Sequence, residues 1–384
     1  MSFFIGSLII SLSATVVSAK TLFGYNKIRL VYKIVGTVLI AFGWFTPFIV
    51  AFMARKFPDI GRPLWTTAYI GYTLCGFSFI LFCLLMGRDL IWFSSYLTAK
   101  ILKRENKKYH PKNPESYPLL NKTNLICVIA AVLLTGYALF EGSRLPPEKE
   151  VVVASDKIEG TLTVVQLSDL HINRFTSAKH LKQIVDKTNA LTPDLIVLTG
   201  DIFDDSFDLI QKTSSELSAL KAAYGVYMVW GNHEFYHDIP RRGRDIKKLG
   251  VSGLHNVGRN LTRHNVYLAG IDFPVLPEKK LQDVYKNKID GEFVLLLSHY
   301  PAAFDKPAGE NADLILSGHT HGGQIFPFHF MAKRMNGYLA GMYEKKNGAR
   351  LYVSRGTGLW GPPLRLLAPP EITVIKLTGV TEDR

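Results

Sequence analysis

Residues 161–171 read TLTVVQLSDLH, a short apolar run rich in β-branched residues that ends in an aspartate and a histidine. A run of this kind predicts a buried β-strand. Helix-period segments follow at 177–190 and 208–223, and this alternation predicts an α/β domain. Further buried strands are expected at 195–198, 226–230, 266–271, 293–297 and 313–316. Two last strands, at 350–354 and 371–377, are expected to be antiparallel edge strands.

Acidic, amide and imidazole side chains stand just past the carboxyl end of five of these strands. The fragments read DLH at 169–171, GD at 200–201, GNHE at 231–234, H at 299 and GHTH at 318–321. Ligands of open α/β sheets bind in the crevice outside the carboxyl ends of the strands, so we expect these side chains to converge. One such fragment is common by chance, but five in order, each at the same end of a strand, indicate a functional site.

The chemistry of this set indicates a pair of metal ions. It offers oxygen and nitrogen donors but no thiolate, because the three cysteines, at 75, 83 and 127, lie in apolar runs elsewhere. Such donors suit divalent Mn, Fe, Zn, Co or Ni. Seven ligand-type side chains exceed what one ion needs, whereas two ions about 3.5–4 Å apart that share a bridging carboxylate would use them all.

The ordered set D-x-H, G-D, G-N-H-E, H and G-H-x-H resembles the motif of the calcineurin-like metallophosphoesterase superfamily, over residues 161–377. Residues 354–372 (SRGTGLWGPPLRLLAPPEI) and GGQ at 322–324 look like the YkuE-like bacterial branch, whose members carry N-terminal membrane segments. The resemblance implies a metal-dependent phosphoesterase with a four-layer α/β domain, in which helices flank a central β-sandwich.

The resemblance also implies a role for each motif residue. The first metal would be held by Asp169, His171 and His321, the second by Asn232, His299 and His319, and both by Asp201 as a bridge. His233 would bind no metal but would face the substrate phosphate and help the leaving oxygen depart. A metal-bridging hydroxide would then attack phosphorus in line.

Four further residues near these motifs have competing interpretations. Asp204 and Asp205 either orient metal ligands or begin a solvated loop. Arg355 either binds the substrate phosphate or is a surface residue. Glu234 completes the GNHE fragment and is expected to support its loop rather than to bind metal.

The first 150 residues have a different character. They carry 17 Lys and Arg against 7 Asp and Glu, so they hold most of the net charge of +13. Stretches without charged side chains, approaching the length of about 20 residues that a membrane-spanning helix needs, lie at 3–19, 34–54, 64–87 and 124–140. The first could instead be the core of a secretion signal, and the last a buried core helix. Residues 89–104 are either an interfacial amphipathic helix or an extension of the third span.

Charge in the loops predicts the orientation. The 20–33 loop carries four basic residues and the 88–122 loop eight, so both are expected in the cytoplasm. The catalytic domain would then lie outside the cytoplasmic membrane of a bacterium. The expected division is a transmembrane helical domain of about four helices at 1–141, a linker at 142–150 and a metallophosphoesterase domain at 151–384.

The function expected is a membrane-anchored dinuclear-metal phosphohydrolase that cleaves a phosphomonoester, phosphodiester or pyrophosphate bond. Its partners would be membrane lipids and a phosphorylated substrate, from the envelope or linked to lipid. A nuclease or nucleotide phosphodiesterase on the same metal centre is the alternative, but the near-neutral second half disfavours nucleic acid. A non-catalytic membrane scaffold is a third possibility, against which the complete ligand set argues.

Overall fold

The computed structural model describes residues 2–24, 26–57, 62–102, 114–236, 239–274 and 278–380. It divides into two compact units. The helical unit comprises Met1–Ser143 and Gly361–Leu366, and the sheet unit comprises Arg144–Trp360 and Leu367–Arg384. The last helix of the first stretch ends at Ser143 and the first strand begins at Glu148, so the expected linker at 142–150 contains the point of division.

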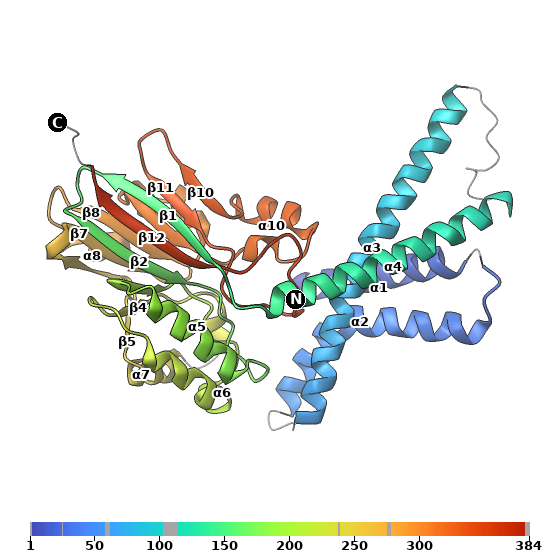
Figure 1. The fold of residues 1–384 in the computed structure, drawn as a ribbon, viewed down its shortest axis with the longest axis horizontal. Coiled ribbons are helices and arrows are strands. Elements are labelled where there is room, and N and C mark those ends of the chain that lie inside the picture. The colour runs from blue at the N-terminus through green and yellow to red at the C-terminus, as the bar shows by residue number, and fades with distance from the viewer. Residues whose placement is uncertain are drawn as a thin grey trace. The chain divides into compact units, whose positions relative to one another are not determined.

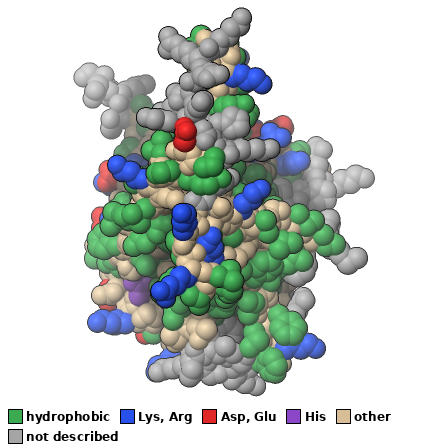
Figure 2. Space-filling model, turned by 90° about the vertical axis from the view of Figure 1, so that its right-hand side faces the viewer, with side chains coloured by type: hydrophobic (Ala, Val, Ile, Leu, Met, Phe, Trp, Pro, Cys, Tyr) green, Lys and Arg blue, Asp and Glu red, His purple; other side chains and the backbone are tan. Residues whose placement is uncertain are grey.

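Four long helices make up most of the helical unit: α1 (Ser2–Phe23), α2 (Leu30–Lys56), α3 (Arg62–Ile101) and α4 (Tyr117–Ser143). Each is long and apolar enough to cross a membrane. Large apolar side chains point outward along them, and hydrophobic side chains cover broad areas of the face drawn in Figure 2, where acidic side chains are few. The four expected spans are therefore confirmed as helices of membrane-spanning length and composition.

Helix α3 continues without a break through residues 89–101, so this part of the 89–104 segment extends the third span. Residues 103 and 104 lie outside the described part of the chain. Forty residues of helix measure about 60 Å, roughly twice the hydrocarbon thickness of a bilayer. Part of α3 must therefore project beyond the hydrocarbon layer if the helix spans a membrane.

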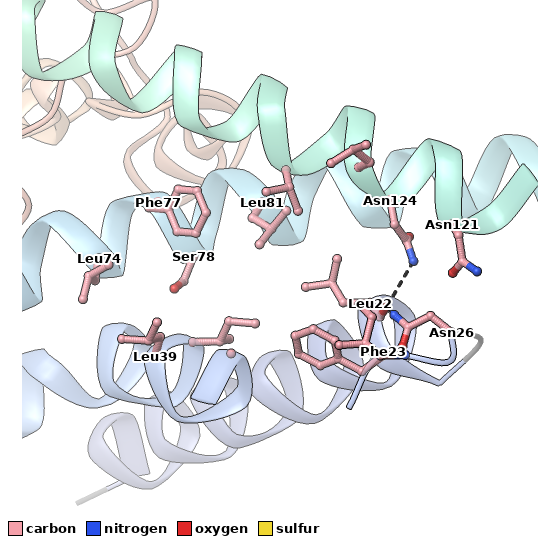
Figure 3. A pocket seen from close by; sticks show the side chains of 15 residues that line it. Leu22, Phe23, Asn26, Leu39, Leu74, Phe77, Ser78, Leu81, Asn121 and Asn124 are labelled. Carbon is pink, nitrogen blue, oxygen red and sulfur yellow. Dashed lines mark hydrogen bonds between the residues drawn. The ribbon is translucent and has the colours of Figure 1, made fainter. Parts of the chain in front are cut away.

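Side-chain amides satisfy the carbonyl groups at the end of α1. The Nδ2 of Asn124 donates to the carbonyl oxygens of Thr21 and Leu22, at 2.9 and 3.3 Å, and Asn26 Nδ2 donates to that of Leu22 at 2.7 Å. These amides lie at the polar end of a cavity of about 560 Å³ whose walls are otherwise mostly apolar (Figure 3). Helix-end carbonyls need such partners where water is scarce.

The sheet unit contains two six-stranded sheets (Figure 1). In the first, the strand order is β1 (Glu148–Ser155), β12 (Ile372–Gly379), β2 (Thr161–Leu167), β3 (Leu195–Leu198), β4 (Val226–Met228) and β5 (Val251–Gly253). In the second, it is β10 (Gly341–Glu344), β11 (Arg350–Val353), β9 (Leu314–Ser317), β8 (Phe293–Ser298), β7 (Val266–Ile271) and β6 (Val257–Leu261).

Both faces of each sheet are buried, which produces four layers. In β3, Leu195 and Val197 join the core between the sheets, whereas Ile196 and Leu198 pack beneath the helices α5 (Ala178–Ala190), α6 (Phe207–Ser214) and α7 (Ile239–Lys248). A third core joins the outer face of the second sheet to α8 (Glu278–Tyr285) and α9 (Pro307–Glu310). Successive side chains of a strand point to opposite faces of the sheet, so a strand that is buried on both faces is apolar at nearly every position. The expected four-layer α/β fold is confirmed.

Two expectations about individual elements are wrong. Strands β11 and β12 are not edge strands: β11 lies between β10 and β9, and β12 lies between β1 and β2. β1 and β10, which the sequence did not identify as strands, take the edges. The helix expected at 208–223 ends at Ser214 and gives way to a 3₁₀ turn at Ser215–Ala219. Serine hydroxyls there bond to backbone carbonyls three or four residues earlier, a type of contact that disfavours regular helix.

Candidate metal centre

The five motif fragments follow strands of both sheets. Asp169 and His171 follow β2, Asp201 follows β3, and Asn232 follows β4, all in the first sheet. His299 follows β8 and the pair His319 and His321 follows β9, in the second sheet. Strands β2, β3 and β4 run parallel to one another, as do β8 and β9, so their carboxyl ends form one rim of each sheet. The expected crevice thus lies across two packed sheets instead of along one open sheet.

Three overlapping groups of potential ligand atoms lie at this rim. They are Asp169 with His171 and His321, His171 with Asp201 and His233, and Asp201 with His299 and His319. Within each group the atoms lie within 4.8 Å of one another. Asp201 and His171 each belong to two groups, so the structure joins the groups into one continuous cluster. A cluster of this kind has room for more than one cation.

In this cluster, potential metal-ligating atoms face one another. The Nε2 atoms of His171 and His321 are 3.0 Å apart, and His299 Nε2 lies 3.1 Å from a carboxylate oxygen of Asp201. His299 Nδ1 lies 2.8 Å from the carbonyl oxygen of Thr199 and must donate to it, so the lone pair of the neutral ring is at Nε2. Lone pairs directed at other lone pairs repel unless a proton or a cation lies between them. The donor set therefore fits divalent metal ions.

A buried amide oxygen supports the same conclusion. The Oδ1 atom of Asn232 is buried and has no hydrogen-bond partner among the residues that the structure describes. A buried polar atom without a partner costs about 1–3 kcal/mol, and such groups are rare in native proteins. A metal ion would supply the missing partner for this oxygen.

The backbone at the ligands is held in a strained conformation. Asp169, His171, Asp201, His319 and His321 all have positive φ angles, of 53, 46, 51, 72 and 50°. Residues other than glycine seldom adopt this left-handed region, and each such residue costs about 1–3 kcal/mol. Five of the seven expected ligands share this conformation, which turns their side chains into the crevice. Strain concentrated in this way is typical of functional sites.

Two glycines allow the fragments to pack tightly. A Cβ atom at Gly318 would overlap Ser168 Oγ and Asp169 Oδ2, and one at Gly231 would overlap Asp201 Oδ1. The glycines of the GNHE and GHTH fragments therefore do more than permit turns. At these two positions a neighbouring carboxylate occupies the space that a Cβ atom would fill, so only glycine fits.

Several hydrogen bonds orient the ligands. Asp204 Oδ1 lies 2.6 Å from His171 Nδ1 and 2.8 Å from His233 Nδ1, so this carboxylate holds both rings. Asp205 instead forms a two-pronged ion pair with Arg174, at 2.9 Å for each bond, and takes no part in the cluster. Of the two interpretations of this acidic pair, ligand orientation describes Asp204. Asp205 matches neither interpretation, because it pairs with Arg174.

Glu234 anchors the loops that carry the cluster. Its fully buried carboxylate accepts hydrogen bonds from the backbone N–H groups of Asp201, Ile202, Phe203 and Gly231, at 2.7–3.2 Å. Glu234 therefore joins the loop after β3 to the loop after β4, as its expected supporting role requires. Arg355, for which a phosphate contact was one interpretation, pairs with the buried Glu371 at 2.9 Å.

The structure brings to the site residues for which the sequence patterns predicted no role. Ser168 donates a 2.5 Å hydrogen bond to Asp169 Oδ2. The Tyr236 and Trp360 rings lie 4.8 and 6.1 Å from that of His233 and are largely exposed. The side-chain amide of Gln324 holds the backbone of Trp360 by two hydrogen bonds. Ser168 adjoins a motif residue and could have been suspected, whereas Gln324 and Trp360 lie in the 322–324 and 354–372 segments, from which no role at the site was predicted.

The charges and the burial of the cluster shift the pKa values of its side chains in different directions, and burial raises the pKa of Asp169. Burial alone would lower the pKa of His171, but Asp204 and the other carboxylates outweigh it and raise the pKa to about 9. In the same way Asp201 raises the pKa of His299 to about 10. Burial would raise the pKa of Asp201, but His299 and its neighbours hold it well below its usual range. His319 behaves differently, since burial and the positive charge of His299 lower its pKa to about 3.

Comparisons with known proteins agree with this geometry. The family model described as calcineurin-like phosphoesterase matches residues 162–323. An uncharacterized metallophosphoesterase of Campylobacter jejuni is 31% identical over 281 residues, which cover 70% of this chain and 73% of the relative. The metallophosphoesterase YkuE of Bacillus subtilis is 35% identical over 228 residues, covering 56% of this chain and 78% of that protein.

A further relative shares the combination of domains. It is named transmembrane protein with metallophosphoesterase domain, comes from Danio rerio, and is 32% identical over 276 residues, covering 67% of this chain and 62% of that protein. The four apolar helices and this relative both indicate a membrane protein. Together with the metal-fitting cluster and the matched residues, the relatives show a metal-dependent phosphoesterase. The chain belongs to the calcineurin-like metallophosphoesterase family.

Proposed function

We propose that the chain hydrolyses a phosphomonoester, phosphodiester or pyrophosphate bond of an envelope or lipid-linked substrate at the outer face of a bacterial cytoplasmic membrane. The observation that carries the proposal is the continuous cluster in which Asp201 and His171 each join two ligand groups. Two divalent metal ions bound there would lower the pKa of water and neutralise phosphoryl oxygens. The outward location rests on the basic residues of the 20–33 and 88–122 loops.

In this proposal the ligands divide as the family pattern implies. One ion would be held by Asp169, His171 and His321, the other by Asn232, His299 and His319, and Asp201 would contribute to both sites. Asp204 fixes Nδ1 of His171 as the protonated nitrogen, which leaves Nε2 free as the ligand atom.

His233 has a separate role. Asp204 holds its Nδ1, so Nε2 is the nitrogen left to donate a proton to the leaving oxygen of the substrate. The exposed rings of Tyr236 and Trp360 lie beside His233, where they would contact the leaving group. Cleavage then needs correct placement of the phosphate and a proton at Nε2 of His233, and residues of this chain provide both.

Metal analysis coupled to hydrolysis tests the proposal. The full chain in detergent is assayed on p-nitrophenyl phosphate and bis(p-nitrophenyl) phosphate, then on a panel of lipid phosphates and a single-stranded polynucleotide. We expect hydrolysis that chelation abolishes and added metal restores. Asp290→Asn, at a fully exposed site, serves as the matched control for Asp201→Asn. Hydrolysis that survives complete metal removal would contradict the proposal, and a steeply salt-dependent preference for the polynucleotide would favour a nuclease.

A further inference from the structure

Helix α10 (Phe328–Asn336), labelled in Figure 1, belongs to the sheet unit and has several exposed apolar side chains. Its Phe330 and Met335 side chains are 72% and 63% exposed, and Met331 is 52% exposed. Phe326 and Phe328 add two more exposed rings next to them. Only Ala332 is buried within the helix. Single exposed hydrophobic residues are ordinary, but a contiguous group on one element indicates an interaction surface.

The charge on this helix is entirely positive. Lys333 and Arg334 are exposed beside the apolar side chains, and Asp and Glu are absent from the whole stretch from 314 to 343. A short helix with bulky apolar side chains and basic residues matches the type that lies in the plane of a membrane interface. Nine residues of helix measure about 14 Å, so α10 could lie on a bilayer but could not cross it.

The helix also lies directly against the metal centre. A Cβ atom at Gly323 would overlap the backbone of His329 in α10, so the two segments are in close contact. Gly323 is two residues from His321, one of the ligands in the cluster. Aromatic rings extend this contact: the ring centroid of Phe326 lies 4.7 Å from that of His329 and 5.9 Å from that of Phe330. Whatever covers this surface therefore lies beside the site at which phosphate would bind.

We propose that Phe326, Phe328, Phe330, Met331 and Met335, with Lys333 and Arg334, form a lipid-docking surface that seats α10 on an anionic phospholipid bilayer. The rest of the chain makes a bilayer the appropriate occupant. It carries four helices of membrane-spanning length, and only residues 144–147 separate the last of them from β1. Basic side chains among apolar ones complement an anionic headgroup layer.

The consequence concerns the substrate and rests on the proposed function. With α10 docked, a phosphorylated headgroup could reach the metal cluster without its lipid leaving the bilayer. The surface would then distinguish membrane-borne phosphoesters from soluble ones, because only the former gain from the docked geometry. Soluble esters would be hydrolysed at a rate that does not depend on these side chains.

Depth-dependent fluorescence quenching tests the docking without any measurement of activity. In the full chain, Cys75, Cys83 and Cys127 are replaced by Ala, and the substitution Phe330→Cys provides a single thiol. This thiol is labelled with an environment-sensitive dye, and the protein is placed in nanodiscs that contain anionic phospholipid. Ile289→Cys is the matched control, since Ile289 is 60% exposed but lies before β8, at the strand end opposite His299. We expect doxyl-labelled lipids to quench the dye at position 330 and not at 289.

Other outcomes overturn the proposal and identify another occupant. If the dye is shielded from water at every protein concentration but is not quenched by doxyl lipids, the chain's own helices cover α10. Shielding that appears only as protein concentration rises would show a second copy of the chain there. A fully solvated dye in the nanodisc would show that nothing covers the surface.

Kinetics provide a second and separate readout. In the unmodified background, Phe330→Ser with Arg334→Glu should lower hydrolysis of a phosphorylated lipid in anionic vesicles about tenfold, since one buried Phe alone accounts for that much affinity. Hydrolysis of p-nitrophenyl phosphate should not change, and this also shows that the variant folds. An equal loss on both substrates would overturn the docking role. Quenching at position 330 in a chain without any hydrolytic activity would overturn the proposed function and leave the docking intact.

Discussion

Asp204 accepts a hydrogen bond from His171, with 2.6 Å between the carboxylate Oδ1 and the ring Nδ1. The same oxygen lies 2.8 Å from Nδ1 of His233, so one carboxylate orients both the proposed ligand His171 and the proposed proton donor. His171 and His233 therefore share a support, and their ring centroids lie 4.7 Å apart. Partners of this type fix the tautomer and the orientation of a metal-binding imidazole.

Asp204→Asn should weaken metal binding about 10–100-fold, because an amide no longer holds the two rings with a negative charge. Titration of the metal-free full chain with Mn²⁺ or Zn²⁺ measures the effect. The control is Asp205→Asn, one residue away, which breaks an ion pair with Arg174. Equal weakening in both variants would show that Asp204 acts only on the loop.

His233→Ala should slow turnover about 10²–10⁴-fold while both metals stay bound, because in the proposed mechanism this ring donates a proton and is not a metal ligand. Asp201→Asn and Asn232→Ala should lose metal as well as activity. Elemental analysis of the three purified variants beside their kcat values separates the two behaviours. Similar metal loss in all three would refute the separate role of His233.

Metal affinity should rise with pH between about 6 and 9. The pKa values of His171 and His299, raised to about 9 and 10 in the metal-free protein, mean that protons occupy the ligand nitrogens at neutral pH. These bound protons stabilise the metal-free fold below the unfolded pKa of about 6.5, and this stabilisation is lost as pH rises through 9–10.

Metal must therefore displace protons, and about two should be released per chain at pH 7.5. Calorimetric titration in two buffers of different ionisation enthalpy counts them. Binding without proton release would contradict the raised pKa values. Asp201 should remain ionised throughout, because its pKa is lowered.

Gly318→Ala should disrupt the metal centre, since the added methyl group would overlap Asp169 Oδ2 and Ser168 Oγ. The expected cost is about 1–3 kcal/mol in stability, with reduced metal occupancy. Gly243→Ala in α7 is the control, because a Cβ there meets no atom within 4 Å. Thermal unfolding and metal content measure the two effects. Unchanged metal content in Gly318→Ala would show that the loops adjust freely.

Local patterns in the sequence were enough to predict the four membrane-capable helices, most of the buried strands and the order of the ligand fragments. An apolar run of membrane-spanning length or a β-branched run that ends in DLH carries its own signal, because helix length and strand burial depend on nearby residues. The positions of β11 and β12 could not be predicted in this way. Which strand pairs with β12 is decided by the packing of residues about 220 positions apart, as Glu148 and Ile372 show.

The supporting contacts of the site also depended on the tertiary structure. Asp204 and Asp205 are adjacent acids with the same chemistry in the sequence, yet one holds two histidines and the other holds Arg174. Likewise no helix was expected at 328–336, and only the structure shows α10 packed against Gly323 with Phe330 and Met335 exposed. The sequence by itself determined which side chains could bind metal, since donor chemistry belongs to the residue. Only the tertiary structure decided which of them meet and what orients them, since hydrogen bonds and burial depend on long-range packing.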